Sequence, residues 1–379
     1  MADDLVKFGD EATWDLICSG RSIGIFQAES PLVQSWLRRI KPRNIWEMSA
    51  VVAAVRPGVL ASGYADQYVI NKDDPDNIPS YGNDIIDDIF KSTNGTLLYQ
   101  ETLMALGSRL AWPHLEENKR LVQVDKLRKA VGKKNQQKIM EVGREFVEGC
   151  TKNGVDKELS DKLFELIKNC GRYAFNLSHA AKYARIGYET AYFKCHYPLE
   201  FFTVYLSYSK LKNKDPLDEL AKLVNDARSF GIQVLSPNIN AKNIEFSIEG
   251  EAIRFGLSNI KFVTSKFLDA IHTLPRLTDW RDFIRLCFTD KFGIKPNKNT
   301  VEALVVTGAF GDLGLGRKVL LNLHGFLSDL TDKELGFLIN CLDGETLIKI
   351  NSIYDLKTLP YPTRRAAKLA SLIQFLDLD

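Results

Sequence analysis

Apolar residues recur at every third or fourth position along most of this chain, the spacing of helices that bury one face. Residues 157–169 show the pattern clearly, because Leu159, Leu163 and Leu166 would lie on one side of a helix. The alternation that is typical of strands is confined to residues 232–257. The pattern therefore predicts a mainly α fold with one small β region.

Proline and capping residues set the limits of several of these elements. Ser30 before Pro31 predicts a helix start, since serine caps helices and proline fits their first position. Strands are predicted at 232–235, 246–248 and 252–257, the last two joined as a hairpin at Glu249-Gly250. The predicted helices span residues 10–19, 32–40, 103–110, 125–134, 136–150, 157–169, 178–193, 217–230, 263–271, 279–287, 299–306 and 317–323.

Length and composition are those of a globular protein with more than one domain. The 379 residues exceed what one core normally serves, and the chain is 45% hydrophobic and 26% charged. Six cysteines without a CxxC pair favour reduced thiols in a cytoplasmic protein. No apolar run reaches the roughly 18 residues of a membrane span, and the N-terminus lacks a signal-peptide pattern. We therefore expect a cytoplasmic protein with no membrane partner.

A basic run stands out against a net charge of only +2. From Lys119 to Arg144 there are nine Lys or Arg and two acids. On a helix over 125–134, Lys126, Lys129 and Lys133 would share one wedge, while Leu127 and Val131 would pack inward. Asp125 is the expected N-cap of this helix. Such a run is most often a solvated helix face, and the alternative is a surface for a polyanion.

Two other places could hold an anion. Arg56 follows a buried apolar run and stands on a rigid Pro57-Gly58 turn, which is either an exposed cation site or simply a turn. Ser178 and His179 lie near the start of a helix that Ser178 or Asn176 would cap. The N–H groups and partial positive charge of a helix start favour phosphate, although a histidine there is as often structural.

Three other motifs resemble functional sites but have plainer explanations. Asp74-Pro75-Asp76 has the D-x-D spacing of metal-binding polymerase sites, but no apolar strand flanks it, so a solvated loop is expected. Residues 311–318 lack the Gly-Lys-Ser/Thr ending of a phosphate loop. Residues 341–348 are similar to the first block of an intein, beginning at Cys341, but only about thirty residues follow, and later splicing elements are missing.

Several separated motifs agree on one family. The chain resembles the alpha subunit of bacterial DNA polymerase III, the C-family replicative polymerase, from its fingers to its helix-hairpin-helix part. The motifs follow the family's order over most of residues 8–325, and the ordered set is far more specific than any one of them. They are GIFQAES (24–30), RPG (56–58), YQE (99–101), LRKAVGKK (127–134), FVEGCTKNG (146–154), FNLSHAAKY (175–183), AYFKCHYPLEF (191–201) and IRFGLSNI (253–260).

The resemblance implies a domain order and a set of roles. It implies multi-helical fingers at 1–207, a linker with an amphipathic helix and β-hairpin at 208–258, a helix-hairpin-helix-like DNA-binding domain at 259–325, and a helical extension at 326–379. Fingers close over the incoming nucleoside triphosphate and the templating base, so binding of dNTP and primer-template DNA is implied. The implied phosphate-binding residues are Arg56, Arg128, Lys129, Lys133, Lys134, Ser178 and His179; Tyr99 and Gln100 would face the nascent pair or template, and Lys126, Lys261, Thr264 and Ser265 would contact DNA.

The departures from the family matter as much. The metal-binding palm carboxylates precede the fingers in the family and are not in this sequence, so no catalytic residue or metal ligand is assigned here. We expect a split polymerase of the kind a phage carries, with Mg²⁺ held mainly by a separate palm-bearing chain, other replisome subunits as possible partners, and no polymerisation by this chain alone. The alternative is a non-catalytic DNA-binding or replisome-interaction protein derived from the fingers.

The first hairpin of the helix-hairpin-helix region departs in a second way. Residues 260–265 read IKFVTS, without the glycines that let backbone amides approach duplex phosphates. Ser and Thr side chains could still contact phosphate, without the close backbone approach that glycine permits. Residues 297–310 fit the family's second helical element better.

Overall fold

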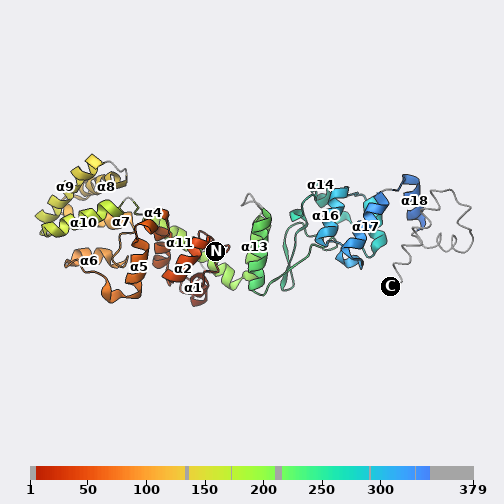
Figure 1. Ribbon diagram of the computed structural model, residues 1–379, viewed down its shortest axis with the longest axis horizontal. Helices are drawn as coiled ribbons and strands as arrows, with labels where there is room; N and C mark the ends of the chain where they lie inside the picture. The colour runs from red at the N-terminus through yellow and green to blue at the C-terminus, as the bar shows by residue number, and fades with distance from the viewer. Residues whose placement is uncertain are drawn as a thin grey trace, which may run out of the picture. The chain divides into compact units, whose positions relative to one another are not determined.

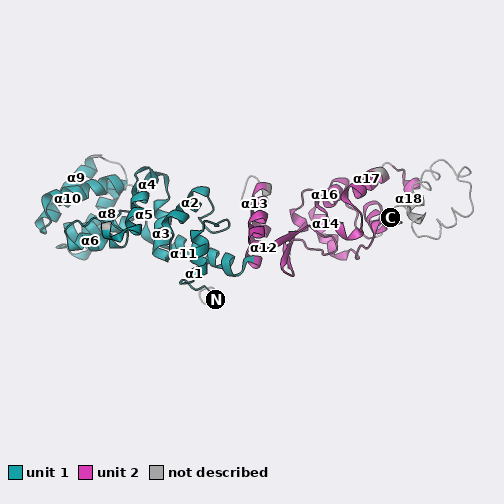
Figure 2. Cartoon of the chain, turned by 60° about the horizontal axis from the view of Figure 1, so that its bottom comes forward, with its two compact units in different colours: residues 1–198 teal, residues 199–379 magenta. Residues whose placement is uncertain are grey.

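A computed structural model describes residues 6–132, 136–171, 173–209, 216–289, 292–328 and 330–341 (Figure 1). The chain forms two compact units, residues 1–198 and 199–379, which Figure 2 colours separately. The described residues are mostly helical with one small sheet, so the predicted mainly α class is confirmed. No helix among them is long and apolar enough to cross a membrane.

The described residues of unit 1 form mainly helices joined by turns and loops. Its helices begin where capping residues satisfy the first N–H groups, as predicted for Ser30, whose Oγ accepts the N–H of Val33 at 3.3 Å. The helices are α1 (Glu11–Cys18), α2 (Pro31–Ile40), α3 (Ile45–Ala54), α4 (Pro57–Ala61), α5 (Tyr64–Asp73), α6 (Asp84–Lys91), α7 (Gln100–Leu106), α8 (Glu117–Gly132), α9 (Gln136–Lys152), α10 (Lys157–Cys170) and α11 (Leu177–His196), with a 3₁₀ turn at Pro75–Asn77 and a π-helical turn at Gly107–Ala111.

Two cores lie inside unit 1. The first is centred on the long contact between α3 and α11, where Met48 and Tyr188 are buried together with Leu37. The second joins α7 to α10 through Leu127, Phe146 and other buried side chains. Because each core is apolar and continuous, both hold their helices by burial rather than by surface charge.

The chain crosses between these two cores at several points, two of which lie together at the starts of α7 and α11. Tyr99 and Phe175 form an isolated parallel bridge, in which Phe175 N–H donates to the Leu98 carbonyl and Gln100 N–H to the Phe175 carbonyl, both at 2.9 Å. The start of α7 and the start of α11 are therefore held side by side, although 76 positions separate Tyr99 from Phe175 in sequence.

Unit 2 has a three-stranded sheet and a third core. Strand β3 lies between β1, to which it is parallel, and β2, to which it is antiparallel, with Ile253 opposite Val234 and Ile248. The predicted hairpin at Glu249-Gly250 is thus confirmed. The elements are α12 (Pro198–Tyr208), which starts at the boundary, α13 (Pro216–Ser229), β1 (Gln233–Leu235), β2 (Ser247–Glu249), β3 (Ala252–Arg254), α14 (Ser265–Ala270), α15 (Trp280–Phe288), α16 (Lys298–Thr307), α17 (Arg317–Ser328) and α18 (Asp332–Cys341), with 3₁₀ turns at Leu257–Asn259, Ile271–Thr273 and Gly311–Leu313.

The expected start of the basic helix is wrong. Helix α8 begins at Glu117, so Asp125 lies in its middle instead of capping it. The carboxylate of Asp125 instead pairs with side chains three and four positions later on the same helix. The predicted inward face is confirmed, since Leu127 and Val131 are buried.

For two of the motifs that resemble functional sites, the structure agrees with the plainer explanation. Asp74, Pro75 and Asp76 are exposed, as a solvated segment requires. No strand feeds residues 311–318, because α16 ends at Thr307 just before them. Residues 342–348, almost all of the intein-like block, lie outside the described residues.

Candidate nucleotide- and DNA-binding surfaces

Two of the residues that the sequence singled out meet at one cavity of unit 1. Arg56 and His179 both line a hollow of about 250 Å³, together with Gln27, Phe175 and Tyr183. Arg56 stands at the N-cap of α4, but its side chain makes no capping hydrogen bond. Its guanidinium instead donates to the Tyr173 carbonyl at 3.2 Å and lies 4.6 Å from the Phe175 ring centre. The structure therefore brings a cation and several planar rings to the mouth of one hollow.

The rings at this cavity form a continuous ladder. The His179 ring centre lies 4.0 Å from that of Tyr183 and meets Phe175 edge-on at 5.3 Å, and Phe26 packs against Tyr183 at 5.1 Å. Stacked and edge-on rings of this kind stabilise one another and hold their orientation. Phe175 and Tyr183 were missed as site residues; the signal for Tyr183 was its spacing of four from His179 on α11, whereas Phe175 precedes that helix.

The start of α11 already carries a carboxylate. Glu101 accepts the Leu177 N–H and the Asn176 side-chain amide, both at 2.8 Å. Asn176, not Ser178, is the cap, since its Oδ1 accepts the His179 N–H at 2.8 Å. The expectation that this helix start offers free N–H groups is wrong for Leu177 and His179, because sequence alone did not reveal that Glu101 folds onto it.

Tyr99 and Gln100 join the start of α7 to the segment before α11 in this structure. The Tyr99 side chain is buried, and burial raises the pKa of its phenol. Gln100 donates its side-chain amide to the Ala174 carbonyl at 3.3 Å, beside the bridge at Phe175. Their predicted role at the nascent base pair stays a prediction, and in this conformation Tyr99 lies away from solvent.

The basic face of α8 is partly neutralised. Asp125 accepts from Lys129 at 2.6 Å and Arg128 at 2.8 Å, and these hydrogen bonds hold the pKa of its carboxyl below the usual range. Lys126 lies 2.8 Å from Glu145 and 3.8 Å from Glu141, and the bond to Glu145 raises the pKa of its ammonium group. An arriving polyanion would therefore compete with protein carboxylates for these cations.

A groove of about 860 Å³ runs between α8 and α9 at this place. Lys126 and Lys129 line it with Lys138, as their shared helical wedge predicts, and Asp125 and Glu141 line it too. Lys133 and Lys134, which were expected to grip phosphate, lie outside the described residues.

In unit 2, the predicted DNA-contacting residues lie at the hairpin before α14. Lys261 is exposed with its ammonium group 5.1 Å from the Phe262 ring centre. The Thr264 hydroxyl accepts the Phe267 N–H at 3.3 Å and so caps α14, while Ser265 is exposed in the first turn. Phe262 itself, which sequence reasoning did not select, has a φ of 70°.

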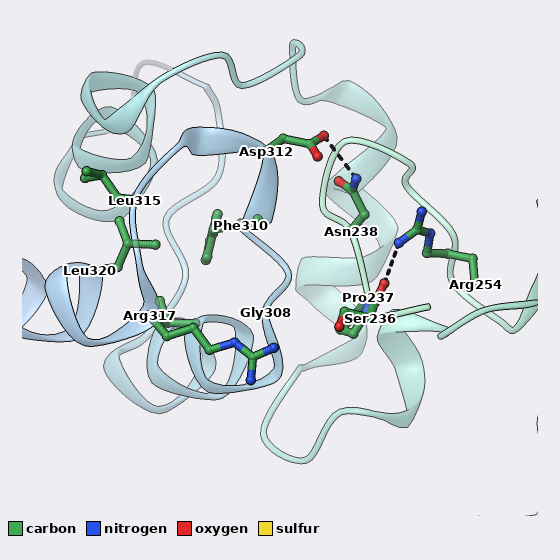
Figure 3. Close-up of a pocket in the computed structure, with 12 residues that line it drawn as sticks. Ser236, Pro237, Asn238, Arg254, Gly308, Phe310, Asp312, Leu315, Arg317 and Leu320 are labelled. Carbon is green, nitrogen blue, oxygen red and sulfur yellow. Dashed lines mark hydrogen bonds between the residues drawn. The ribbon is translucent and has the colours of Figure 1, made fainter. Parts of the chain in front are cut away.

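A polar network joins the segment between β1 and β2 to the 3₁₀ turn at Gly311–Leu313 (Figure 3). Asp312 accepts from Asn238 at 3.0 Å and from Asn240 at 3.2 Å, and these bonds lower the pKa of its carboxyl. Arg254 donates to the Ser236 carbonyl at 2.7 Å, beside a cavity of about 230 Å³. The donors and acceptors largely satisfy one another, so this network serves the fold.

Among the described residues, one group of three side chains has metal-ligand chemistry. The ligand atoms of Asp10, Cys195 and His196 lie within 4.8 Å of one another, and His196 Nε2 is 2.8 Å from Asp10 Oδ2. A thiol and an imidazole suit zinc, whereas Mg²⁺ prefers oxygen ligands. This group of three therefore suits zinc better than Mg²⁺.

Comparison with known proteins defines the class to which these features belong. Residues 4–154 match the family model for the bacterial DNA polymerase III alpha subunit finger domain, and residues 231–320 match a helix-hairpin-helix motif. The chain is therefore a relative of the bacterial DNA polymerase III alpha subunits, over a portion that runs from the fingers to the helix-hairpin-helix. The resemblance drawn from the sequence motifs is confirmed.

Particular relatives are DNA polymerase III alpha subunits of three bacteria. The chain is 36% identical to that of Aquifex aeolicus over 317 residues, which is 82% of this chain and 26% of the relative. It is 31% identical to that of Bacillus subtilis over 341 residues, 88% of this chain and 29% of the relative. It is 30% identical to that of Pseudomonas aeruginosa over 317 residues, again 82% and 26%. The chain thus spans less than a third of the length of these relatives.

Proposed function

We propose that this chain supplies the fingers and helix-hairpin-helix parts of a replicative DNA polymerase and acts with a separate palm-bearing chain. In this proposal it binds the incoming dNTP and the primer-template, and the assembly carries out template-directed nucleotidyl transfer. The observation that carries the proposal is the meeting of Arg56 and His179 with Phe175 and Tyr183 at one cavity, and Arg56 lies within residues 4–154, the stretch that matches polymerase fingers.

The lining of the cavity suits one part of a phosphorylated, planar ligand. A guanidinium can bind phosphate oxygens through two parallel hydrogen bonds, and Arg56 is oriented by its contacts to Tyr173 and Phe175. Because phosphoryl transfer is accelerated mainly by positioning and charge, a fixed cation at this place would contribute to the reaction without joining it chemically. The basic face of α8 would add Lys126 and Lys129 once a triphosphate displaced Asp125 and Glu145 from them.

The metal chemistry belongs to the other chain in this proposal. Two Mg²⁺ would activate the primer hydroxyl and neutralise the leaving phosphates. No group of three carboxylates among the described residues is placed to hold them. We therefore expect this chain alone to bind nucleotide and DNA but to polymerise nothing.

The decisive experiment mixes this chain with a palm-bearing chain and measures primer extension. Extension is expected only in the mixture. Arg56→Ala should weaken binding of a fluorescent dNTP by about tenfold, the usual cost of losing a charge-assisted hydrogen bond. Arg228→Ala, at an exposed position on α13, is the matched control and should change nothing. Extension that stays absent with both chains folded would contradict the enzyme proposal.

A non-catalytic DNA-binding or replisome-interaction protein is the second candidate. The carboxylates of Asp125, Glu145 and Glu101, which occupy the expected phosphate positions, favour it. The two candidate functions predict different effects of replacing Lys133 and Lys134. Replacing both by Ala should weaken dNTP binding far more than DNA binding if the chain serves a polymerase. A fall only in DNA affinity and in its salt dependence would favour the second candidate.

A further inference from the structure

The hairpin before α14 holds an aromatic residue in an unusual backbone conformation. Phe262 has a φ of 70°, in the left-handed region that glycine adopts readily and bulky residues avoid. Its side chain gains little from burial, because it is 54% exposed. A strained residue that the core does not need points to a use outside the core.

The hairpin is held from behind, which explains how the strain persists. The Thr300 hydroxyl, buried in α16, donates to the Phe262 carbonyl at 2.7 Å. Ile260 is buried next to it, and the Val263 N–H donates to the Ile260 carbonyl at 3.2 Å. The backbone is therefore fixed while the ring faces outward.

A cavity of about 350 Å³ lies against this ring. Its lining from α16 combines the apolar Ala303 and Val306 with the polar Asn299 and Glu302, and Val306 is 55% exposed. This volume is near the lower end of small-molecule sites and is far too small for a protein interface. It is of the size that suits one planar ring system with a few polar edge groups.

We propose that this cavity binds an unpaired nucleobase of single-stranded DNA, stacked on Phe262. The Asn299 amide and the Glu302 carboxylate offer hydrogen bonds to the base edge, and Lys261, beside the ring, faces the adjoining phosphate. The inference rests on the proposed DNA binding and deepens it, by naming which form of DNA the first hairpin takes.

Duplex phosphate is the less suitable ligand for this hairpin. A glycine hairpin lets backbone amides approach a duplex backbone, whereas the Phe262 ring stands in the way of that approach. Glu302 lines the same cavity as Lys261 and lies 3.8 Å from Lys298, so negative charge is present beside the hairpin. Stacking on an aromatic face needs no excess of positive charge and tolerates any base sequence.

The test uses the full chain and two probes, an oligothymidylate of about twelve nucleotides and a duplex of the same length, followed by fluorescence anisotropy. Phe262→Ala should weaken binding of the single strand by about tenfold and leave duplex binding unchanged. Phe262→Trp should keep the affinity and show fluorescence quenching by the single strand. Tyr208→Ala, on α12 with a side chain that is 62% exposed, is the control and should have no effect.

A second variant separates recognition from folding. Phe262→Gly relieves the backbone strain, so it should keep the melting temperature while losing single-strand affinity like Phe262→Ala. Single-strand affinity that survives both variants overturns the inference, as does an equal loss for single strand and duplex. Duplex binding without single-strand binding by the natural chain also overturns it while the proposed function stands; absence of binding to either probe removes both.

Discussion

Lys194 is a fully buried lysine whose charge is tied to the backbone of a neighbouring segment. Its ammonium group donates to the carbonyls of Arg21 and Ile23 at 2.8 and 2.7 Å. The same segment is fixed again where the Phe26 N–H donates to the Thr190 hydroxyl at 3.0 Å. Both anchors come from α11, so this helix sets the path of the chain toward Gln27 at the candidate nucleotide cavity.

Replacing Lys194 by Met should lower the free energy of unfolding of unit 1 by about 3 kcal/mol, because the carbonyls of Arg21 and Ile23 lose a fully buried donor. Urea unfolding followed by tryptophan fluorescence would measure this, since Trp14, Trp36, Trp46 and Trp112 all lie in unit 1. Lys182→Met, at an exposed position of the same helix, should cost less than about 0.5 kcal/mol. Equal effects of the two variants would contradict the assigned anchor.

Glu101 provides a second test at the scale of one side chain. Glu101→Gln removes a negative charge from the start of α11 and should lower the free energy of unfolding by about 1 kcal/mol. If Ser178 and His179 bind phosphate, the same variant should bind a nucleotide more tightly, because a competing anion is gone. Isothermal titration with dNTP measures the second effect, and weaker binding would instead make Glu101 a positioning residue for the ligand.

Single residues also show where sequence reasoning stops. Sequence reasoning assigned roles to Arg56 and His179 but none to Phe175 and Tyr183, because the ring contacts among them depend on how α11 meets its neighbours. Asp125 was expected only as a helix cap, and Glu101 lay inside the YQE motif, yet only the fold reveals that Asp125 pairs with Arg128 and Lys129 and that Glu101 bonds the start of α11. The sequence could predict which groups are able to bind phosphate. It could not predict that a protein carboxylate already bonds to them.

At the scale of elements, periodicity succeeded where one face is buried and failed where the pattern is interrupted. The α10 pattern and the hairpin of β2 and β3 came out as predicted. The start of α8 was missed because Leu121 and Val122 are 51% and 68% exposed, which hides the helical repeat. Helices α4 and α5 were missed because proline and glycine break up a short stretch that favours turns.

Helix α17 carries a buried histidine that makes unit 2 sensitive to acid. His324 is 4% exposed, packs 5.4 Å from the Phe288 ring, and burial lowers the pKa of its imidazole below the ordinary 6.5. The nearby Glu302 acts in the opposite direction and Lys298 in the same one. The unfolded chain therefore takes up a proton more readily than the folded one.

The stability of unit 2 should accordingly fall as the pH drops below about 6.5, because its contribution from neutral His324 is present above that value and is lost through the lower folded pKa. Hydrogen exchange of α15 and α17, corrected for the intrinsic effect of pH, should show less protection at low pH. His324→Leu should remove much of this dependence. A dependence that persists unchanged in the variant would assign it to other groups.

At the scale of the whole molecule, each unit has a core of its own. The compact units divide at Pro198, within the helical stretch before the boundary of 207 that the motifs predicted, and the four domain limits remain predictions. The family could be predicted from the order of the motifs. The boundary between the units could not be predicted as closely, because the sequence pattern of the apolar helix α12 does not show which unit it packs against.

Two separate chains should therefore each retain one activity. Residues 1–198 should bind a fluorescent dNTP, and residues 199–379 should bind DNA, each with an affinity close to that of the full chain. Circular dichroism would first establish that both are helical. Loss of both activities in folded fragments would mean that each ligand needs both units.

The bridge between Tyr99 and Phe175 has a consequence for how this chain tolerates change. The helices α7 to α10 leave and rejoin the first core at a single point, so the two ends of this lobe lie next to each other. Segments attached in this way can be lengthened, shortened or exchanged without rethreading the core from which they emerge. A graft between Glu101 and Ala174 needs only to preserve that point of attachment and to offer an apolar surface to Ile86 and Phe90, which pack on the lobe.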